Sequence, residues 1–298
     1  MSTKAAPSTP LLLRPGTPDD AGDCGQICYE AFATLANGHG FPPDFPTPDA
    51  AVGVLSALLA HDGFFSVVAE IDGEIVGSNF LDERSVIAGV GPITVDPTTQ
   101  NRGVGRDLML AVLERAKQRK VAGVRLLQAA YHTRSLSLYA KLGFDVREAV
   151  ATLQGAPILE EVPGYTVRQA TEEDLAACNR VCFLVHGHDR NGEVVDAISR
   201  GAPRGGEAQV VEHDGRITGY TTGIAFFAHT VGETNEDLKA LICAAHGFGG
   251  PGFLVPVRNA DLFRWCLERG LKVVQVMTLM TLGLYNEPSG AYLPSILY

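Results

Sequence analysis

The sequence lacks the features that identify a secreted, membrane-spanning or nucleic-acid-binding protein. Its 34 acidic residues outnumber 24 Lys and Arg, and the net charge of −10 disfavours nucleic acid or an anionic membrane as a partner. No apolar run approaches the length of a membrane span, and Met1–Pro10 has no apolar core like that of a signal peptide. We expect this first segment to be disordered and the protein to be cytoplasmic. The acidic charge favours a cationic or amine-bearing substrate, although it equally serves solubility.

Thiol chemistry and metal binding also find little support in the sequence. The six cysteines show no Cys-x-x-Cys spacing and stand among apolar residues, which is typical of buried, reduced thiols. His186-Gly187-His188 is a His-x-His pair without further ligands at a useful spacing. We therefore expect a loop at this pair and no metal site.

The most informative stretch of the chain runs from Val95 to Arg106 and reads V-D-P-T-T-Q-N-R-G-V-G-R. An apolar run (87–95) precedes it, and a helical pattern (107–120) follows it. The unpaired amides and the dipole at a helix start attract anions, and glycine lets a phosphate approach the backbone closely. The stretch therefore predicts a loop that binds a phosphorylated cofactor. Its two glycines and two arginines are Gly103, Gly105, Arg102 and Arg106.

The spacing of this loop decides between classes of phosphate-binding motif. It has neither the G-x-G-x-x-G of a dinucleotide fold nor the Gly-Lys-Ser/Thr of a Walker loop. The Gly-rich segment 247–252 follows a helical pattern and so does not fit a strand-led nucleotide loop. The spacing Gln-x-x-Gly-x-Gly after Val-x-Pro instead resembles the pyrophosphate loop of the GNAT superfamily of acetyl-CoA-dependent N-acyltransferases.

A second segment strengthens this resemblance. Residues 132–144 read H-T-R-S-L-S-L-Y-A-K-L-G-F and are similar to the family's Asn-x-x-Ala-x-x-Leu-Tyr-x-Lys-x-Gly-Phe segment. Leu138-Tyr139, Lys141 and Gly143-Phe144 match, whereas His132 and Ser135 stand where the family usually has Asn and Ala. The two segments together cover residues 87–144.

The resemblance implies acetyl-CoA as the cosubstrate and places its binding residues. In the GNAT fold the strand before the loop splays from its neighbour, so the non-donating Pro92 is tolerated there. The pantetheine arm would then lie against backbone groups of residues 93–95. The implied cofactor-binding residues are Ile93, Thr94, Val95, Gln100, Asn101, Arg102, Gly103, Val104, Gly105, Arg106, His132 and Ser135.

By the same resemblance, Tyr139 is the catalytic general acid that protonates the departing thiolate. The alternative is that Tyr139 packs in the core of an amphipathic helix. Many family members carry a carboxylate base on the strand before the loop, and this strand has none before Asp96. Asp82 and Glu83 are the nearest candidates for the base, but both could instead be solvated surface charges. A water relay could also accept the proton, and we assign no base.

The chain contains an internal duplication. The pattern Arg-x-x-Thr-x-x-Asp-x-x-x-Cys-x-x-x-Cys at residues 14–28 recurs at residues 168–182. Two hairpins with Asp-Gly turns, at Asp72 and Asp214, also correspond. The cysteines of each copy lie at i and i+4, which favours a helix core face over a redox or metal pair. The joint between the copies falls near residues 161–165.

The second copy has no recognisable cofactor loop. The offset between the copies falls from 142 at Asp72/Asp214 to 127 at Gly143/Gly270, so the second copy is 15 residues shorter where the first carries the loop. Residues 231–237 of this interval add Glu233, Glu236 and Asp237, which would repel a pyrophosphate. The register also places Cys266 opposite Tyr139. Only the first copy is expected to carry out chemistry.

These patterns predict an α/β protein of two tandem GNAT-like domains, at 1–162 and 163–298, each a mixed, mostly antiparallel, twisted sheet flanked by helices. In the first we expect strands at 11–14, 66–81 (a hairpin), 87–95, 124–130 and 145–153, and helices at 19–33, 49–61, 105–120 and 135–142. The first domain is expected to bind acetyl-CoA, and the second to pack beside the acceptor pocket.

The resemblance implies transfer of an acetyl group to a primary amine of a small molecule or peptide, by direct attack in a ternary complex. The alternatives are a non-catalytic acyl-CoA sensor and a transferase with another acyl group or an oxygen or sulfur acceptor. The mycothiol synthase family is also a tandem GNAT, but it is expected to keep its active signature in the second half. The oligomeric state is not indicated.

Overall fold

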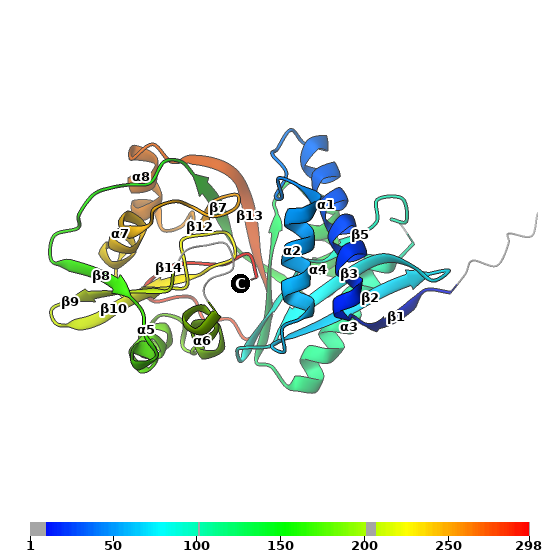
Figure 1. Ribbon diagram of the computed structural model, residues 1–298, viewed down its shortest axis with the longest axis horizontal. Coiled ribbons are helices and arrows are strands. Elements are labelled where there is room, and N and C mark those ends of the chain that lie inside the picture. The colour runs from blue at the N-terminus through cyan, green and yellow to red at the C-terminus, as the bar shows by residue number, and fades with distance from the viewer. Residues whose placement is uncertain (1–9, 101, 201–206, 298) are drawn as a thin grey trace, which may run out of the picture.

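The computed structural model describes residues 10–100, 102–200 and 207–297. Nearly all of the segment predicted to be disordered (1–10) and the predicted cofactor ligand Asn101 lie outside these described residues. The described chain forms two β-sheets with helices packed against them, which confirms the predicted fold class (Figure 1).

The larger sheet has nine strands in the order β1-β2-β3-β4-β6-β13-β7-β12, with β5 pairing with β3. The strands are β1 (Leu12–Pro15), β2 (Phe64–Ile71), β3 (Glu74–Asp82), β4 (Ile87–Val90), β5 (Thr94–Val95), β6 (Gly123–Ala129), β7 (Asp145–Gln154), β12 (Phe253–Pro256) and β13 (Lys272–Gly283). The smaller sheet has the order β14-β11-β10-β9-β8. Its strands are β8 (Tyr165–Gln169), β9 (Gln209–His213), β10 (Arg216–Thr221), β11 (Thr230–Gly232) and β14 (Ala291–Leu293).

Helices cover both faces of the first half of the large sheet. Alternate residues of β2 point to opposite faces, so Val67 packs beside α3 and Val68 beside α1 and α2. The helices of the first half are α1 (Ala21–Gly38), α2 (Pro48–Leu59), α3 (Val104–Arg119) and α4 (Thr133–Lys141). Those of the second half are α5 (Leu175–His186), α6 (Asn191–Arg200), α7 (Asn235–Ala244) and α8 (Ala260–Glu268).

The predicted strand at 87–95 is interrupted. β4 ends at Val90, a cis Gly91–Pro92 peptide follows, and β5 begins at Thr94. Proline has no amide to donate to a ladder, which is why the strand breaks here. β4 pairs with both β3 and β6, whereas the short β5 pairs with β3 alone among the described strands. One edge of β5 is therefore left for another partner.

The predicted duplication appears in matching side-chain networks. Arg14 donates to Asp20 at 2.7 and 2.8 Å and to Glu70 at 2.7 Å. Arg168 makes the equivalent bonds to Asp174 at 2.7 and 2.8 Å and to Glu212 at 2.8 Å. In both copies a Thr and the Asp also form a capping box at the helix start. The four repeated cysteines, Cys24, Cys28, Cys178 and Cys182, are fully buried and free, as their spacing predicts.

The two halves share the large sheet. β13, from the second half, lies between β6 and β7 of the first half, and β7 in turn lies between β13 and β12. The sheet therefore continues across the predicted boundary at residue 162, and β7 and β13 meet at the centre of the molecule in Figure 1. The division into domains at 1–162 and 163–298 therefore stays a prediction, based on the repeat in the sequence.

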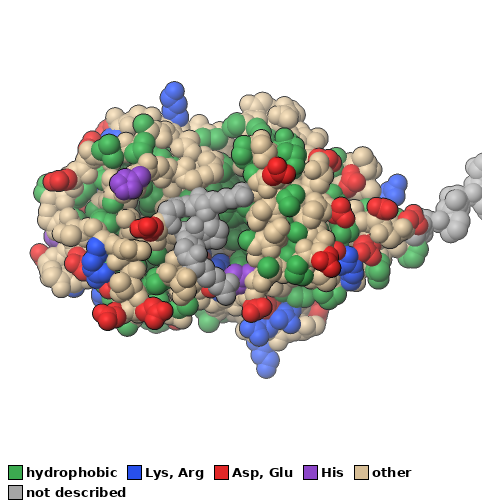
Figure 2. Space-filling view, in the orientation of Figure 1, with side chains coloured by type: hydrophobic (Ala, Val, Ile, Leu, Met, Phe, Trp, Pro, Cys, Tyr) green, Lys and Arg blue, Asp and Glu red, His purple; other side chains and the backbone are tan. Residues whose placement is uncertain are grey.

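The surface view shows a hollow with hydrophobic side chains on its walls between the two lobes (Figure 2). On this face, acidic and basic side chains are interspersed over both lobes. Within the described residues, no helix is both long enough and apolar enough to span a membrane.

Candidate active site

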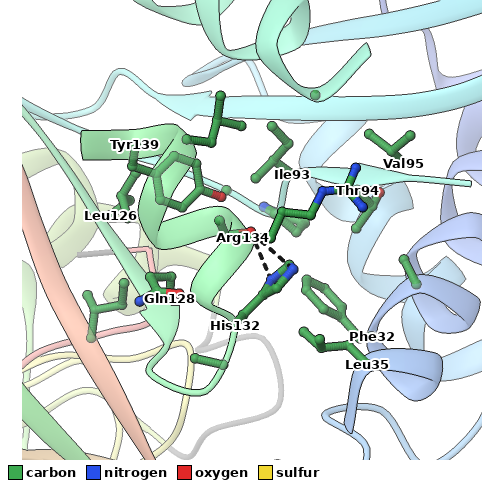
Figure 3. A pocket seen from close by; sticks show the side chains of 18 of the residues that line it. Phe32, Leu35, Ile93, Thr94, Val95, Leu126, Gln128, His132, Arg134 and Tyr139 are labelled. Atoms are coloured by element: carbon green, nitrogen blue, oxygen red, sulfur yellow. Dashed lines mark hydrogen bonds between the residues drawn. The ribbon is translucent and has the colours of Figure 1, made fainter. Parts of the chain in front are cut away.

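A pocket of about 840 Å³ opens beside the free edge of β5. Its walls come from α1, the loop between α1 and α2, the start of α3, the end of β6, and α4. Residues of the second half complete it, namely Phe226, Phe227, Met277, Ile296 and Leu297. Figure 3 shows Tyr139, His132 and Arg134 on one side of the pocket and Phe32 and Leu35 of α1 on the other. The second half thus lies against the pocket, as the sequence predicts.

The start of α3 carries the features of an anion site. Gly103 has φ +88°, a left-handed conformation that glycine adopts without strain, and no side chain of the described residues caps the helix there. The first-turn amides of α3 therefore have no intrahelical partner and can bind an anion. Arg106 of this turn lines the pocket.

Most of the predicted cofactor-binding residues line this pocket. They are Ile93, Thr94, Val95, Gln100, Gly103, Val104, Gly105, Arg106, His132 and Ser135. Arg102 is exposed and lies outside the lining, because its side chain leaves the loop on the solvent side. The backbone of the loop at 95–106 and the first turn of α3 therefore form this part of the pocket, and the Arg102 side chain does not.

Arg134 is a pocket cation that the sequence interpretation did not include. It donates to Gln100 Oε1 at 2.8 Å and so joins the start of α4 to the loop before α3. Two arginines, Arg106 and Arg134, therefore line the pocket beside the start of α3. The signal available in the sequence was the position of Arg134 two residues after His132, within the segment that matches the family.

Tyr139 is buried, with 5% of its surface exposed, and it lines the pocket. Burial raises the pKa of Tyr139 to about 12, and a hydrogen bond with Ser135 offsets part of this rise. The phenol therefore holds its proton at neutral pH. Figure 3 shows its hydroxyl directed toward the side of the pocket that carries Ile93. The residue combines a core position with access to the pocket.

A short polar chain extends from Tyr139. Ser135 Oγ lies 2.8 Å from His132 Nδ1 (Figure 3), and the Ser135 hydroxyl lowers the pKa of the neighbouring Tyr139. Burial, together with the charge of Arg134, lowers the pKa of His132, so this imidazole is neutral at pH 7. The residues that replace the family's Asn and Ala thus form a hydrogen-bonded pair beside the tyrosine.

Asp82 and Glu83, the nearest base candidates from the sequence, do not line the pocket. Asp82 is buried and pairs with Arg84, with Nε to Oδ1 at 2.9 Å and Nη2 to Oδ2 at 2.5 Å. Glu83 accepts from Arg115 at 2.6 and 2.9 Å. Both carboxylates are therefore structural ion-pair partners, and neither is a solvated surface charge.

Two further polar groups of the pocket were not predicted. Gln128 of β6 is 6% exposed, and neither end of its amide has a hydrogen-bond partner within the described chain. Asp44, in the loop between α1 and α2, accepts from Gln275 Nε2 of β13 at 3.0 Å. The position of Gln128 near the end of a largely apolar strand could have identified it from the sequence. The contact between Asp44 and Gln275 could not be predicted, because the two residues are too far apart in the sequence.

The equivalent cleft of the second half is filled by the protein itself. β11 corresponds to β5, since Gly232 pairs with Gly219 as Val95 pairs with Gly77. Its other edge pairs with β14, which also contacts β12. The C-terminal strand thus occupies the space that corresponds to the pocket of the first half.

The helix start in this second cleft is also closed. Asp237 accepts from the Thr234 amide at 2.8 Å and receives a short hydrogen bond from Thr218. Glu233 pairs with Arg216 at 2.5 Å. A carboxylate of the chain therefore holds the position at α7 that an external anion would need.

Residues 31–144 match the model of the acetyltransferase (GNAT) family. An uncharacterized N-acetyltransferase of Methanocaldococcus jannaschii is 33% identical over 97 residues, which make up 30% of this chain and 42% of that protein. A mycothiol acetyltransferase of Nocardia farcinica is 40% identical over 63 residues, 21% of each chain. The matches thus span less than half of either relative.

Solved structures are similar over nearly the whole chain. A protein of Pyrococcus horikoshii described as an acetyltransferase has a TM-score of 0.72 at 18% identity, covering 97% of this chain and 98% of that one. A tandem GNAT protein from the clavulanic acid biosynthesis pathway has a TM-score of 0.56 at 16% identity, covering 92% and 98%. Residues 31–144 therefore belong to the acetyltransferase (GNAT) family, whose members transfer the acetyl group of acetyl-CoA, and the chain as a whole has the fold of a tandem GNAT protein.

Proposed function

We propose that this protein transfers the acetyl group of acetyl-CoA to a primary amine of a small molecule or peptide, by direct attack in a ternary complex. The observation that carries the proposal is that one pocket holds both an uncapped helix start and a buried tyrosine. The first suits a pyrophosphate and the second suits proton donation.

In this proposal the first-turn amides of α3, with Arg106 and Arg134, hold the phosphates of acetyl-CoA. The free edge of β5, at Thr94 and Val95, offers backbone groups to the pantetheine arm. The cosubstrate supplies an activated thioester. Gln128 adds an unpartnered amide on the facing strand, available to an amide or carbonyl of either substrate.

Tyr139 gives its proton to the departing thiolate, the attacking amine releases its proton to water, and water returns a proton to the phenol. A phenol with a pKa near 12 is protonated at neutral pH and donates only when a strong base, such as a leaving thiolate in an apolar pocket, develops beside it. General acids of this kind contribute about 10²–10⁴-fold to rate. Ser135 orients the hydroxyl, and neutral His132 supports Ser135.

The cellular compartment belongs to the same proposal. The six cysteines are free and buried, which is the state expected in a reducing environment such as the cytoplasm.

The test is turnover of acetyl-CoA across a panel of primary amines, alcohols and thiols, measured as release of free CoA thiol. We expect CoA release that depends on a primary amine, with formation of the acetylated amine by mass spectrometry. Tight CoA binding without turnover on any acceptor would contradict the proposal and favour an acyl-CoA sensor. Turnover confined to alcohols or thiols would identify a different acceptor chemistry.

A further inference from the structure

Among the described residues, Asp44 has no counter-ion. Among the described residues that line the pocket, it is the one that carries a carboxylate. Its Oδ1 accepts one hydrogen bond, from Gln275, and no cation of the described chain pairs with it. Burial raises the pKa of Asp44, and the Gln275 hydrogen bond offsets part of that rise.

Three buried carboxylates of the large sheet and its helices are paired with arginine. Asp20 pairs with Arg14, Asp82 with Arg84, and Glu148 with Arg258, at 2.5–2.8 Å. A carboxylate buried without a cation is costly, so proteins pair such groups or use them for a ligand. The half-buried Asp44 differs from these three carboxylates because no cation of the described residues pairs with it, which leaves its charge available to a ligand.

The loop holds Asp44 in place on both sides. Phe41 stacks on Tyr131, with ring centroids 4.4 Å apart and planes at 7°. Phe45 is buried against Phe32, with centroids 6.2 Å apart. Three prolines in residues 42–46 limit the loop further. The carboxylate is thus fixed before any ligand arrives.

A strand of the second half orients the same group. Gln275 of β13 is 3% exposed, donates to Asp44 through Nε2 at 3.0 Å, and accepts from the Tyr131 hydroxyl at 3.3 Å. These two bonds fix the direction of its amide, and with it the direction of the Asp44 carboxylate. Apolar and aromatic side chains make up the surrounding wall: Phe32, Phe45, Phe226, Phe227, Met277 and Leu297.

We propose that Asp44 is the specificity-determining residue of the acceptor site, and that the acceptor is an organic amine with a positive charge and an apolar or aromatic body. The ammonium lies against Asp44, and the body lies against the aromatic wall. The nitrogen attacks the thioester after it has lost one proton to water, so Asp44 anchors the amine without taking that proton. This inference rests on the proposed acetyltransferase function. An amine with a carboxylate next to it, as in an α-amino acid, is disfavoured because that carboxylate would lie near Asp44.

The first experiment measures binding and so does not depend on turnover. The protein saturated with CoA is titrated calorimetrically with 2-phenylethylamine and with L-phenylalanine. We expect 2-phenylethylamine to bind at least tenfold more tightly than the amino acid. Asp44→Asn should weaken amine binding about tenfold or more and leave binding of the amino acid nearly unchanged.

The control removes the same charge nearby. Asp49 is exposed in the first turn of α2 and does not line the pocket, so Asp49→Asn should leave both affinities unchanged. Asp44→Glu, which keeps the charge, should retain part of the preference. CoA affinity and the melting temperature verify that each variant is folded. Equal amine affinity in the Asp44→Asn and Asp49→Asn proteins, or no amine binding by the wild type, would overturn the inference.

Steady-state kinetics then separate anchoring from chemistry. Asp44→Asn should raise KM for the amine about tenfold or more and change kcat less than threefold. A large fall in kcat with unchanged KM would overturn the anchoring role, because it would mean that Asp44 acts in the chemical step. If amine binding depends on Asp44 but no amine is acetylated, the proposed function fails while the recognition site stands.

Discussion

Tyr139 and Cys266 occupy the same position in the two halves of the chain. The carbonyl oxygen of Tyr139 accepts from the Phe144 amide at 3.0 Å, and that of Cys266 accepts from the Leu271 amide at 3.2 Å. Each helix then ends at a glycine with positive φ, Gly143 at +96° and Gly270 at +83°. The backbone is duplicated, and of the two positions only that of the first copy carries a phenol.

The first prediction concerns this pair. Tyr139→Phe keeps the ring and removes the proton donor, so kcat should fall about 10²-fold or more with little change in CoA affinity. Because the pKa of Tyr139 is raised to about 12, wild-type kcat should show no loss from ionisation of this phenol up to about pH 10. Steady-state kinetics against pH and CoA calorimetry measure both quantities.

Cys266→Ala is the matched control for this prediction. Cys266 is fully buried at the equivalent position, so the variant loses some stability but should keep wild-type kcat. A Tyr139→Phe protein as active as the wild type would reduce the tyrosine to a packing role and would strengthen the sensor alternative.

The second prediction concerns the phosphate loop. A Cβ at Gly105 would meet Val95 and Leu138 at 3.7 and 4.0 Å, which is ordinary contact, so Gly105→Val should fold. The added branch would stand where a pyrophosphate must approach the amides of α3, and CoA affinity should fall about tenfold or more. Gly247→Val, in an exposed loop with open space around the new Cβ, is the control. Unchanged CoA affinity in Gly105→Val would move the phosphate site elsewhere.

The third prediction is the stoichiometry of cofactor binding. β14 fills the second cleft and Asp237 caps α7, so calorimetry on the full chain should give one CoA per chain. In the Gly105→Val protein no second class of sites should become visible. A stoichiometry near two, or a residual site of normal affinity in the variant, would contradict the assignment of the second half as non-binding.

The fourth prediction concerns acid stability. His229 is fully enclosed, with the Tyr220 hydroxyl 3.0 Å from its Nε2 and Glu193 3.2 Å from its Nδ1. Burial, with the charge of Arg190, lowers the pKa of His229 to about 4 from an ordinary value of 6.5. The unfolded chain therefore binds more protons between these values, and stability should fall as pH drops from about 6.5 toward 4.

The size of this effect follows from linkage, since each pKa unit corresponds to about 1.4 kcal/mol. Urea unfolding at pH 7 and pH 5 measures it. His229→Gln should be less stable at pH 7 but lose less stability on acidification than the wild type, whereas the exposed His246→Gln should behave like the wild type. The same loss on acidification in the His229→Gln protein would assign the acid sensitivity to other groups.

The sequence predicted the local elements of the fold and much of the candidate site, because these depend on short-range patterns. The hairpin turns at Asp72 and Asp214, with φ of +57° and +50°, and the Thr47 cap of α2 follow from residues a few positions apart. The loop at 95–106 and Tyr139 carry a spacing that a family preserves. In each case the information lies within one short window of sequence.

The arrangement of β13 could not be predicted in the same way. Its alternating residues suit any partly buried sheet position, and the pattern does not state which strands will be its neighbours. The hydrogen bond between Asp44 and Gln275 joins residues 231 positions apart for the same reason. A local motif also leaves some features undetermined. Arg102 stands within the matching motif, but the motif did not determine whether its side chain lines the pocket.

The insertion of β13 has a consequence for biosynthesis. A ribosome releases the first half of the chain well before residues 272–283, and nascent domains generally fold as soon as they emerge. Here β6 and β7 lack the strand that separates them until that late segment appears. In the nascent first half, one edge of β6 and both edges of β7 therefore lack their strand partners. A protein truncated before Lys272 would lack Gln275, which orients Asp44, and Met277, which lines the pocket, however intact its loop at 95–106.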